Sequence, residues 1–493
     1  MTNTNTSDTS RQLPNNIRNI IRQLVADALD WLSVPERIIA SDLKCHDFNP
    51  VMTYDENGWP ELNKSRNYRI YYGDTPSQDA FINFGGAASK AIVESPSWIT
   101  FKEAIYSDKR LQWYYSVEYY ADTDSALANV SPSGNLSMVQ LQARRTIENI
   151  VDQYIHTFNT FALDDDKFSL IYMLWERDVF AKELCIDFII PLLCISLEED
   201  GIVFDDGMEL TRMSNEQQLM RSLHGHHMFN PNIDNPATHA IVSRGWVCTN
   251  NIEPVVRNHI TFSREYVRSI TNKVDLVFAA IRCVTGHITG YSQLLIVADG
   301  WGLSRYPTLK ASYLTPVREF SDGFDAGIWN KPPQLITKDE LTSITEVYNA
   351  LISSSENKVS LAARRLNAAY LRRSSEDSVV DAIVGLEALL GEGNSEMTHK
   401  IATRLALLCR IVPFESYTPV DVFGFTKKLY SYRSAIVHGT HDLGKQKSIK
   451  HTNSKEIKSV ELAISLLRHA IMVVARHKEY LDPRTIDEAL ING

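Results

Sequence analysis

The chain has few cysteines, and they are not spaced as metal ligands usually are. Its 493 residues include six Cys, at positions 45, 185, 194, 248, 283 and 409, and no two of them form a C-x-x-C pair. This scatter argues against both a zinc ribbon and a disulfide scaffold. It fits a reducing compartment, so we expect the protein to be cytoplasmic.

A long apolar run is also missing. The most apolar stretch, residues 184–197, is interrupted by Asp187 and Pro191 and is too short to span a bilayer. Residues 1–16 are mostly Thr, Asn and Ser, without the apolar segment of a signal peptide. We therefore expect a disordered N-terminus over residues 1–16 and no membrane partner.

The motifs of several enzyme classes are absent from the sequence. The glycines at 85–86 and 300–302 match neither a P-loop nor a dinucleotide fingerprint, and there is no G-x-S-x-G or H-E-x-x-H. Histidines at 224, 226 and 227, followed by His239 and Cys248, have ligand-type side chains but not helical metal spacing. We interpret this group as a polar loop and expect no metal and no cofactor.

Positive charge is unevenly distributed along the chain. The net charge is −10, yet residues 335–493 carry 21 Lys and Arg against 19 Asp and Glu, which leaves the upstream part at −12. Within this region, residues 427–458 contain eight cations and only Asp442 and Glu456 as acids. Two interpretations stay open for this stretch: a solvated polar loop, or a surface that attracts phosphate. On the second, the candidate RNA-binding residues are Lys427, Lys428, Lys445, Lys447 and Lys450.

The strongest boundary signal is the pair Pro332-Pro333, which cannot lie inside a helix or a central strand. Downstream, helical spacing of apolar residues and capping residues predict an all-α domain over residues 335–493. Its expected helices span 339–353, 358–373, 375 to Gly391 or Gly393, 397–410, 419 to Gly439, and 454–480.

Residues 17–330 have a mixed pattern, which predicts an α+β region of one or two domains. Helical spacing marks residues 143–161 and 262–288. Aromatic or apolar runs predict strands at 68–72, 112–120, 188–195 and 292–298, with a turn at 205–207.

The C-terminal region contains an Arg and a His that could act on phosphate. Arg433 and His438 bracket an apolar, helix-compatible run. A guanidinium can stabilise the extra charge on phosphorus, and an imidazole can move the proton of a ribose 2′-hydroxyl, so the pair can cut RNA without a metal. On an ideal helix the two lie about 140° apart. Their convergence therefore needs a helix end between them, as Gly439 predicts, a folded Arg side chain, or a second copy of the chain. The alternative interpretation is a surface Arg and an unrelated helix-terminal His.

Two charged residues lie on the apolar stripes of neighbouring predicted helices. Glu387 follows Ile383 by four positions, and Arg404 follows Ile401 by three. A charge on an apolar face needs a partner, so we expect Glu387 to pair with Arg404 or with Arg433. The pair is either a structural brace between helices or a device that orients Arg433.

The segments Val380–Gly391, His399–Arg404 and Leu429–Gly439, with their order and flanking helices, resemble the HEPN domain of the ApeA-like group. The resemblance covers residues 335–493. A weaker similarity to the region that precedes this domain in related bacterial proteins includes residues 190–193, 206–210 and 274–290.

This resemblance implies an α+β region followed by an all-α HEPN bundle that forms a homodimer. It implies a metal-independent endoribonuclease, the toxic arm of abortive-infection defence against phage, restrained by an N-terminal region that senses a phage-derived trigger. Arg433 and His438 would be catalytic, with Glu387, Arg404 and Ser434 in support. Ser434 stands where many members have Asn, Asp or His, and it can donate to phosphate but not act as acid or base. The alternative is a non-catalytic HEPN module that binds RNA or protein as a scaffold or sensor.

Overall fold

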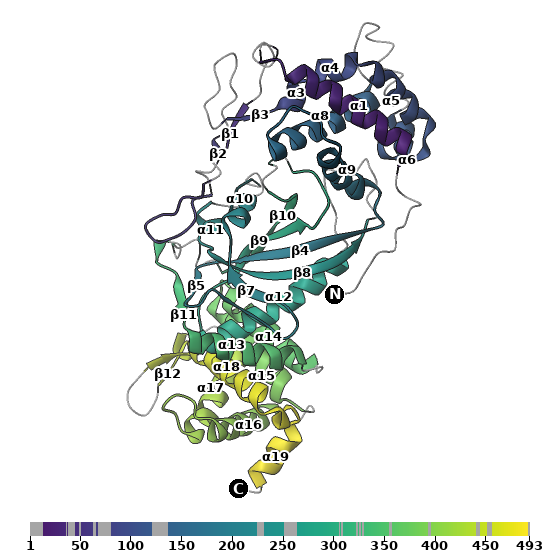
Figure 1. Cartoon of the computed structure of the whole chain (residues 1–493). Helices are drawn as coiled ribbons and strands as arrows, with labels where there is room; N and C mark the ends of the chain where they lie inside the picture. The colour runs from purple at the N-terminus through teal and green to yellow at the C-terminus, as the bar shows by residue number, and fades with distance from the viewer. Residues whose placement is uncertain are drawn as a thin grey trace.

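The computed structural model describes most of the chain. The described residues are 13–35, 37, 45–48, 51–62, 66–67, 80–120, 137–223, 231–250, 264–304, 306, 309–321, 324, 327, 330–353, 357–392, 396–439, 444–450 and 456–491. Figure 1 shows a group of N-terminal helices at one end, a twisted sheet in the middle and the C-terminal helices at the other end.

The central element is a six-stranded antiparallel sheet. Its strand order is β10-β9-β4-β8-β7-β6, so the two longest strands, β4 and β8, lie side by side in its middle. The strand bounds are β4 Glu183–Leu192, β6 Gly201–Val203, β7 Glu209–Arg212, β8 His239–Thr249, β9 Tyr291–Ala298 and β10 Ser312–Glu319.

Side chains alternate across this sheet and so supply two separate cores. In β9, Leu294 and Ile296 belong to the core shared with the C-terminal helices, whereas Leu295 and Val297 belong to a smaller core on the opposite face. The period of two residues in a strand produces this division. The long helix α12, Arg264–Thr285, covers the first face, and helices α10, Asn215–Leu223, and α11, Pro231–Asp234, contribute to the second core.

The N-terminal helices have a core of their own. Buried residues of α1, α5, α8 and α9 form it, including Leu24, Phe101, Ile147 and Trp175. The helix bounds are α1 Asn15–Leu32, α3 Phe84–Ala87, α4 Ser89–Glu94, α5 Pro96–Ser107, α6 Lys109–Tyr114, α8 Met138–Phe158 and α9 Asp165–Phe180. A small antiparallel sheet of order β2-β1-β3 lies beside them, from β1 Cys45–Phe48, β2 Arg66–Asn67 and β3 Ala80–Ile82.

The C-terminal region is mostly helical. Its elements are β11 Gln334–Ile336, α13 Lys338–Ser353, α14 Asn357–Leu371, α15 Ser375–Leu390, α16 Met397–Ile411, α17 Pro419–Val437, the 3-10 helix η5 Gly444–Gln446, β12 Ser448–Lys450, β13 Glu456–Lys458, α18 Ser459–Arg476, η6 Lys478–Leu481 and α19 Pro483–Ile491. The strands β12 and β13 form an antiparallel hairpin, with Ile449 opposite Ile457. β11 pairs in parallel with β5, Ile195–Leu197.

One hydrophobic core continues from the sheet into the C-terminal helices. It contains Phe188 of β4, Phe278 of α12 and Leu386 of α15. The buried Arg282 of α12 donates a 2.5 Å hydrogen bond to Asn367 Oδ1 of α14, which ties the two parts together. The division of the chain at residues 330–335 into independent domains therefore stays a prediction.

Most expected elements of the C-terminal region are present, with two corrections. The helices at 338–353, 357–371, 375–390, 397–411 and 419–437 match the predicted ranges closely. The region is not strictly all-α, because of the β12–β13 hairpin and β11. The last helix begins at Ser459 rather than near 454, since residues 456–458 pair as a strand and Ile457 alternates with exposed Glu456 and Lys458.

Upstream, the helices at 143–161 and 262–288 and the strands at 188–195 and 292–298 are confirmed with shifted ends. The strand expected at 112–120 is wrong: this aromatic segment is helical, and Tyr115 packs into the N-terminal core. Leu13 is buried and α1 begins at Asn15, so the disordered segment cannot extend to residue 16. Residues 1–12 and the strand expected at 68–72 lie outside the described residues. None of the described helices combines the length and the apolar character that a membrane crossing requires.

Candidate functional site

Helix α17 carries both members of the Arg–His pair, and its two ends are fixed by local sequence. Thr418 is the N-cap: its Oγ1 accepts from the Asp421 backbone N–H at 3.2 Å, and Asp421 Oδ2 accepts from the Thr418 N–H at 3.0 Å. This reciprocal box and Pro419 in the first turn start the helix as predicted. At the other end His438 is the C-cap and Gly439 has φ +67°, a conformation that glycine adopts at low cost.

One face of α17 is open to solvent. Val420, Lys427, Ser431, Ser434 and His438 are all exposed, with Val420 at 80%. The last four fall within about 60° of one another at 100° per residue. Opposite them, Val422, Phe425 and Leu429 are buried against the rest of the bundle. The helix therefore presents a polar stripe that ends at the imidazole of His438.

Arg433 lies on the margin between these two faces, beside Glu387 of α15. Its Nη2 is 3.9 Å from Glu387 Oε2, and the two side chains are 33% and 25% exposed. At this distance the contact is a Coulombic attraction rather than a hydrogen bond. The expected pairing of Glu387 with Arg433 is therefore present, while the orienting role of Glu387 stays a prediction.

No described residue accepts a hydrogen bond from the Arg433 side chain, and its Nε is fully covered. A buried N–H without an acceptor is uncommon in folded proteins. The guanidinium is thus held beside Glu387 by charge, and only its Nη groups, on a side chain that is 33% exposed, remain available as donors. This is a useful state for a group that must bind the oxygens of a phosphate.

Tyr430 lies one turn before Arg433 on α17 and is buried on the inner side of the Arg433–Glu387 pair. Burial raises the pKa of its hydroxyl, and the nearby negative charge of Glu387 raises it further. The phenol therefore stays neutral and cannot serve as a second base. Sequence reasoning did not select Tyr430, although its position three residues before the Arg on the same helix is a usable signal.

Arg404 does not join the site. This buried residue of α16 donates to Asp487 Oδ2 of α19 at 2.5 Å and to the Leu390 carbonyl oxygen at 2.6 Å, and it lies 3.4 Å from Glu392. Of the two partners expected for Glu387, Arg404 is therefore not the one observed, because its guanidinium is paired with Asp487 on the terminal helix α19. Arg404 joins the ends of α15 and α16 to α19, a structural arrangement.

Within one chain, no hydrogen bond joins the side chains of Arg433 and His438. The helix continues to Val437, so the two side chains leave it about 140° apart. Three routes could bring Arg433 and His438 together: a helix end between them, a folded Arg side chain, or a second copy of the chain. The geometry of α17 favours the second copy, because His438 and the polar stripe are exposed in one chain.

The five lysines expected to bind RNA lie in different electrostatic settings. Lys447 forms a 2.9 Å ion pair with Glu376, and the hydrogen bond from its ammonium lowers the pKa of Glu376 to about 2. Lys427, Lys428 and Lys450 are exposed, and none forms an ion pair with a described acid, although Lys450 lies opposite Glu456 in the hairpin. Lys445 belongs to η5, and its side chain lies outside the described residues.

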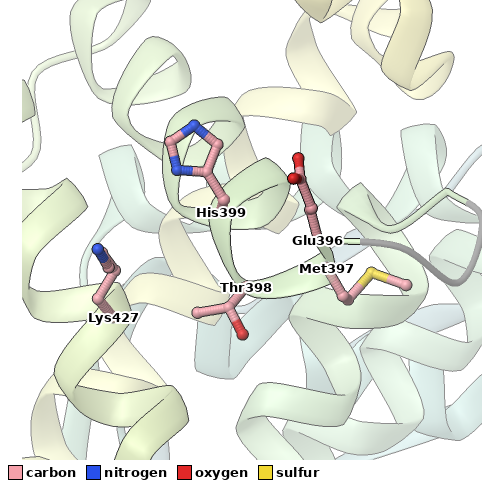
Figure 2. Close-up of a pocket in the computed structure, with 5 residues that line it drawn as sticks. All are labelled: Glu396, Met397, Thr398, His399 and Lys427. Atoms are coloured by element: carbon pink, nitrogen blue, oxygen red, sulfur yellow. The ribbon is translucent and has the colours of Figure 1, made fainter.

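Two hollows flank α17. The first, of about 620 Å³, opens at the start of α16 and is lined by Glu396, Met397, Thr398, His399 and Lys427. Figure 2 shows His399 and Lys427 reaching this space from two different helices. Both side chains contact the ring of Phe423: His399 at 5.6 Å edge-on, and the Lys427 ammonium at 5.5 Å above the ring. The second hollow, of about 590 Å³, lies on the hairpin side of α17.

A metal centre has no basis among the described residues, where no group of three or more His, Cys, Asp or Glu side chains could hold an ion. His239 is buried, its Nδ1 lies 2.9 Å from Thr238 Oγ1, and burial lowers its pKa to about 4. The Cys248 thiol donates to the Leu184 carbonyl oxygen at 3.3 Å. The histidines at 224, 226 and 227 lie outside the described residues.

The chain matches no protein-family model, no curated protein and no solved structure.

Proposed function

We propose that this protein is a metal-independent endoribonuclease whose C-terminal region is a HEPN-type bundle acting as a homodimer. In this proposal Arg433 of one chain and His438 of the other meet at one scissile phosphate. The upstream region restrains the nuclease until an infection cue, such as a phage product, is sensed. The biological role is anti-phage defence in the cytoplasm by abortive infection.

The observation that carries the proposal is the state of the two side chains. Arg433 is half-buried and held 3.9 Å from Glu387, but it donates no hydrogen bond to a described residue. His438 is exposed at the end of the same helix. A cation with unused donors and a solvent-facing imidazole are the two groups that metal-free RNA cleavage requires.

Each group has a defined task in this scheme. His438 takes the proton of the ribose 2′-hydroxyl or protonates the leaving 5′-oxygen. Arg433 binds the non-bridging oxygens as the phosphate becomes pentacoordinate. Ser434, exposed on the stripe, can donate to the same phosphate. The products carry a 2′,3′-cyclic phosphate and a 5′-hydroxyl.

The exposed stripe of α17 supports pairing of two chains. From Val420 to His438 the outward positions follow a spacing of four and three residues, and Gly424, Ser431 and Ser434 among them are small. Such a spacing lets two helices pack along their length, and small side chains let them approach closely. A two-fold pairing would place each His438 against the partner helix.

The test compares total RNA from cells that express wild type, His438→Ala or His477→Ala. His477 is a matched control, because it is also the C-cap of a helix, α18, and is 38% exposed. We expect new 5′-hydroxyl ends and growth arrest with wild type and His477→Ala, but not with His438→Ala. Cleavage that persists in His438→Ala would overturn the scheme. Unchanged RNA in all three strains would favour the non-catalytic module instead.

A further inference from the structure

The second hollow beside α17 has the composition of a binding site. It lies between α17, η5 and the β12–β13 hairpin and measures about 590 Å³. Its polar lining consists mainly of Lys428, Ser431, Gln446, Ser448, Lys450 and Glu456. Lys428 and Ser431 are three residues apart on α17, so they face the hollow from adjacent turns.

The walls of this hollow are held by hydrogen bonds. The Ser459 hydroxyl donates to the Gln446 carbonyl oxygen at 2.5 Å, and the Ser459 N–H donates to the Lys447 carbonyl oxygen at 2.9 Å. Ile449 is only 5% exposed and anchors the hairpin in the bundle core. The lining side chains therefore sit on fixed backbone.

Charge pairing separates the lysines of this region into two groups. Lys447 and Lys458 are neutralised by Glu376 at 2.9 Å and by Glu461 at 2.8 Å. Lys428 and Lys450, the two that line the hollow, form no ion pair with a carboxylate among the described residues, although Glu456 stands opposite Lys450 in the hairpin. Two ammonium groups against one carboxylate leave this concave surface with a net positive charge, which attracts phosphate.

The hollow also contains acceptors, which an inorganic phosphate ion would not use. Glu456 is exposed at its rim, with the Ser448 hydroxyl donating to the carboxylate. A carboxylate repels a free anion but accepts a hydrogen bond from a ribose 2′-hydroxyl, the group that distinguishes RNA from DNA. The combination of two cations and one acceptor therefore fits a ribonucleotide better than phosphate alone.

The position along α17 gives the distance to the scissile bond. Along the axis of α17, Ser431 lies seven residues and Lys428 ten residues before His438, which is about 10 Å and about 15 Å. Phosphates of a stacked strand repeat at about 3.4 Å per nucleotide, so about three to four nucleotides separate the hollow from His438.

We propose that this hollow binds the phosphodiester backbone of single-stranded RNA about three to four nucleotides away from the bond that is cut, with Lys428 and Lys450 as the phosphate-binding residues. This proposal rests on the proposed nuclease function, because the nuclease places the scissile phosphate at His438.

The test measures binding without cleavage. The full chain with His438→Ala is titrated against a fluorescent ten-nucleotide single-stranded RNA at several salt concentrations. K428Q/K450Q is added to this background, and K90Q/K310Q is the matched control, because it removes two exposed lysines from the upstream region. Loss of two phosphate contacts should weaken binding about 25-fold at 0.1 M salt and reduce the log–log salt slope by about 1.4. An affinity and slope equal to those of K90Q/K310Q would overturn the proposal.

Cleavage assays on chains that keep His438 separate this proposal from the nuclease itself. If wild type and K428Q/K450Q cut RNA with the same KM, the hollow proposal is wrong and the nuclease stands. If the lysines control binding but wild type does not cut, the nuclease is wrong and the hollow remains an RNA site. Both lysines are exposed, so K428Q/K450Q should melt at the wild-type temperature.

Discussion

Replacing Glu387 with Gln tests whether this residue orients Arg433 or braces the bundle. Two unit charges 3.9 Å apart, as in the Arg433–Glu387 pair, attract each other by about 4 kcal/mol at an effective dielectric constant of 20. Since both side chains are partly solvated and no hydrogen bond joins them, the net contribution to folding should fall to about 1 kcal/mol. Glu387→Gln should therefore fold and lower the melting temperature by only about 1–2 °C.

The same substitution should have a larger effect on catalysis. Without the carboxylate nothing described holds the guanidinium in place, and a displacement of about 1 Å can cost about 100-fold in rate. We expect a drop of that order in kcat for RNA cleavage with little change in KM.

The matched control for this experiment is Glu346→Gln, because Glu346 forms a 3.8 Å pair with Arg476 at an exposed site away from α17. Thermal melting and single-turnover cleavage are measured for both variants. Unfolding of Glu387→Gln would show that the pair is a brace. Wild-type cleavage by Glu387→Gln would refute the orienting role.

Three further predictions concern stability. Burial lowers the pKa of His469 to about 4, so the stability from keeping it neutral is present above pH 6.5 and is lost as the pH falls toward 4. The loss should reach about 3 kcal/mol in urea melts and should vanish in His469→Leu. A Cβ at Gly85 would lie 2.1 Å from the Glu148 carbonyl oxygen, so Gly85→Ala should cost about 3 kcal/mol by forcing α3 away from α8, visible as a lower melting temperature. Arg404→Leu leaves the Leu390 carbonyl oxygen without its donor and should cost about 2–3 kcal/mol; an unchanged melting temperature would contradict the structural role of Arg404.

Local signals were sufficient to predict the C-terminal helices. Thr418-Pro419 and Gly439 set the ends of α17, and Ser374 accepts from the Asp377 N–H as the cap of α15. These signals work because a cap satisfies backbone groups within a few residues. The β12–β13 hairpin was missed because each of its strands has three residues, too few for a period of two to stand out from a helical pattern.

In the aromatic segment at 112–120, strand propensity alone predicts the wrong secondary structure. Its Trp and Tyr residues favour strands, but Asp108 caps α6 by accepting from the Arg110 N–H at 2.8 Å, and Tyr115 fills the N-terminal core. Tertiary packing decided the outcome, and that packing depends in part on α1 and α9, which are distant in sequence.

The candidate site was predictable only in part. A charge on an apolar stripe correctly required a partner for Glu387, and a nearby helix supplied Arg433. The true partner of Arg404 is Asp487, on the terminal helix α19, and no spacing rule links helices across 83 residues. The separation of paired Lys447 from unpaired Lys428 likewise depends on where Glu376 lies in space.

The proposed mechanism requires Arg433 of one chain and His438 of another to act on the same phosphate. The most direct measurement mixes purified Arg433→Ala and His438→Ala chains, each inactive alone, and follows RNA cleavage in the presence of EDTA. Random pairing gives half mixed dimers, each with one intact composite site, so the mixture should recover about one quarter of the wild-type activity. A mixture that forms mixed dimers but stays inactive would contradict the claim.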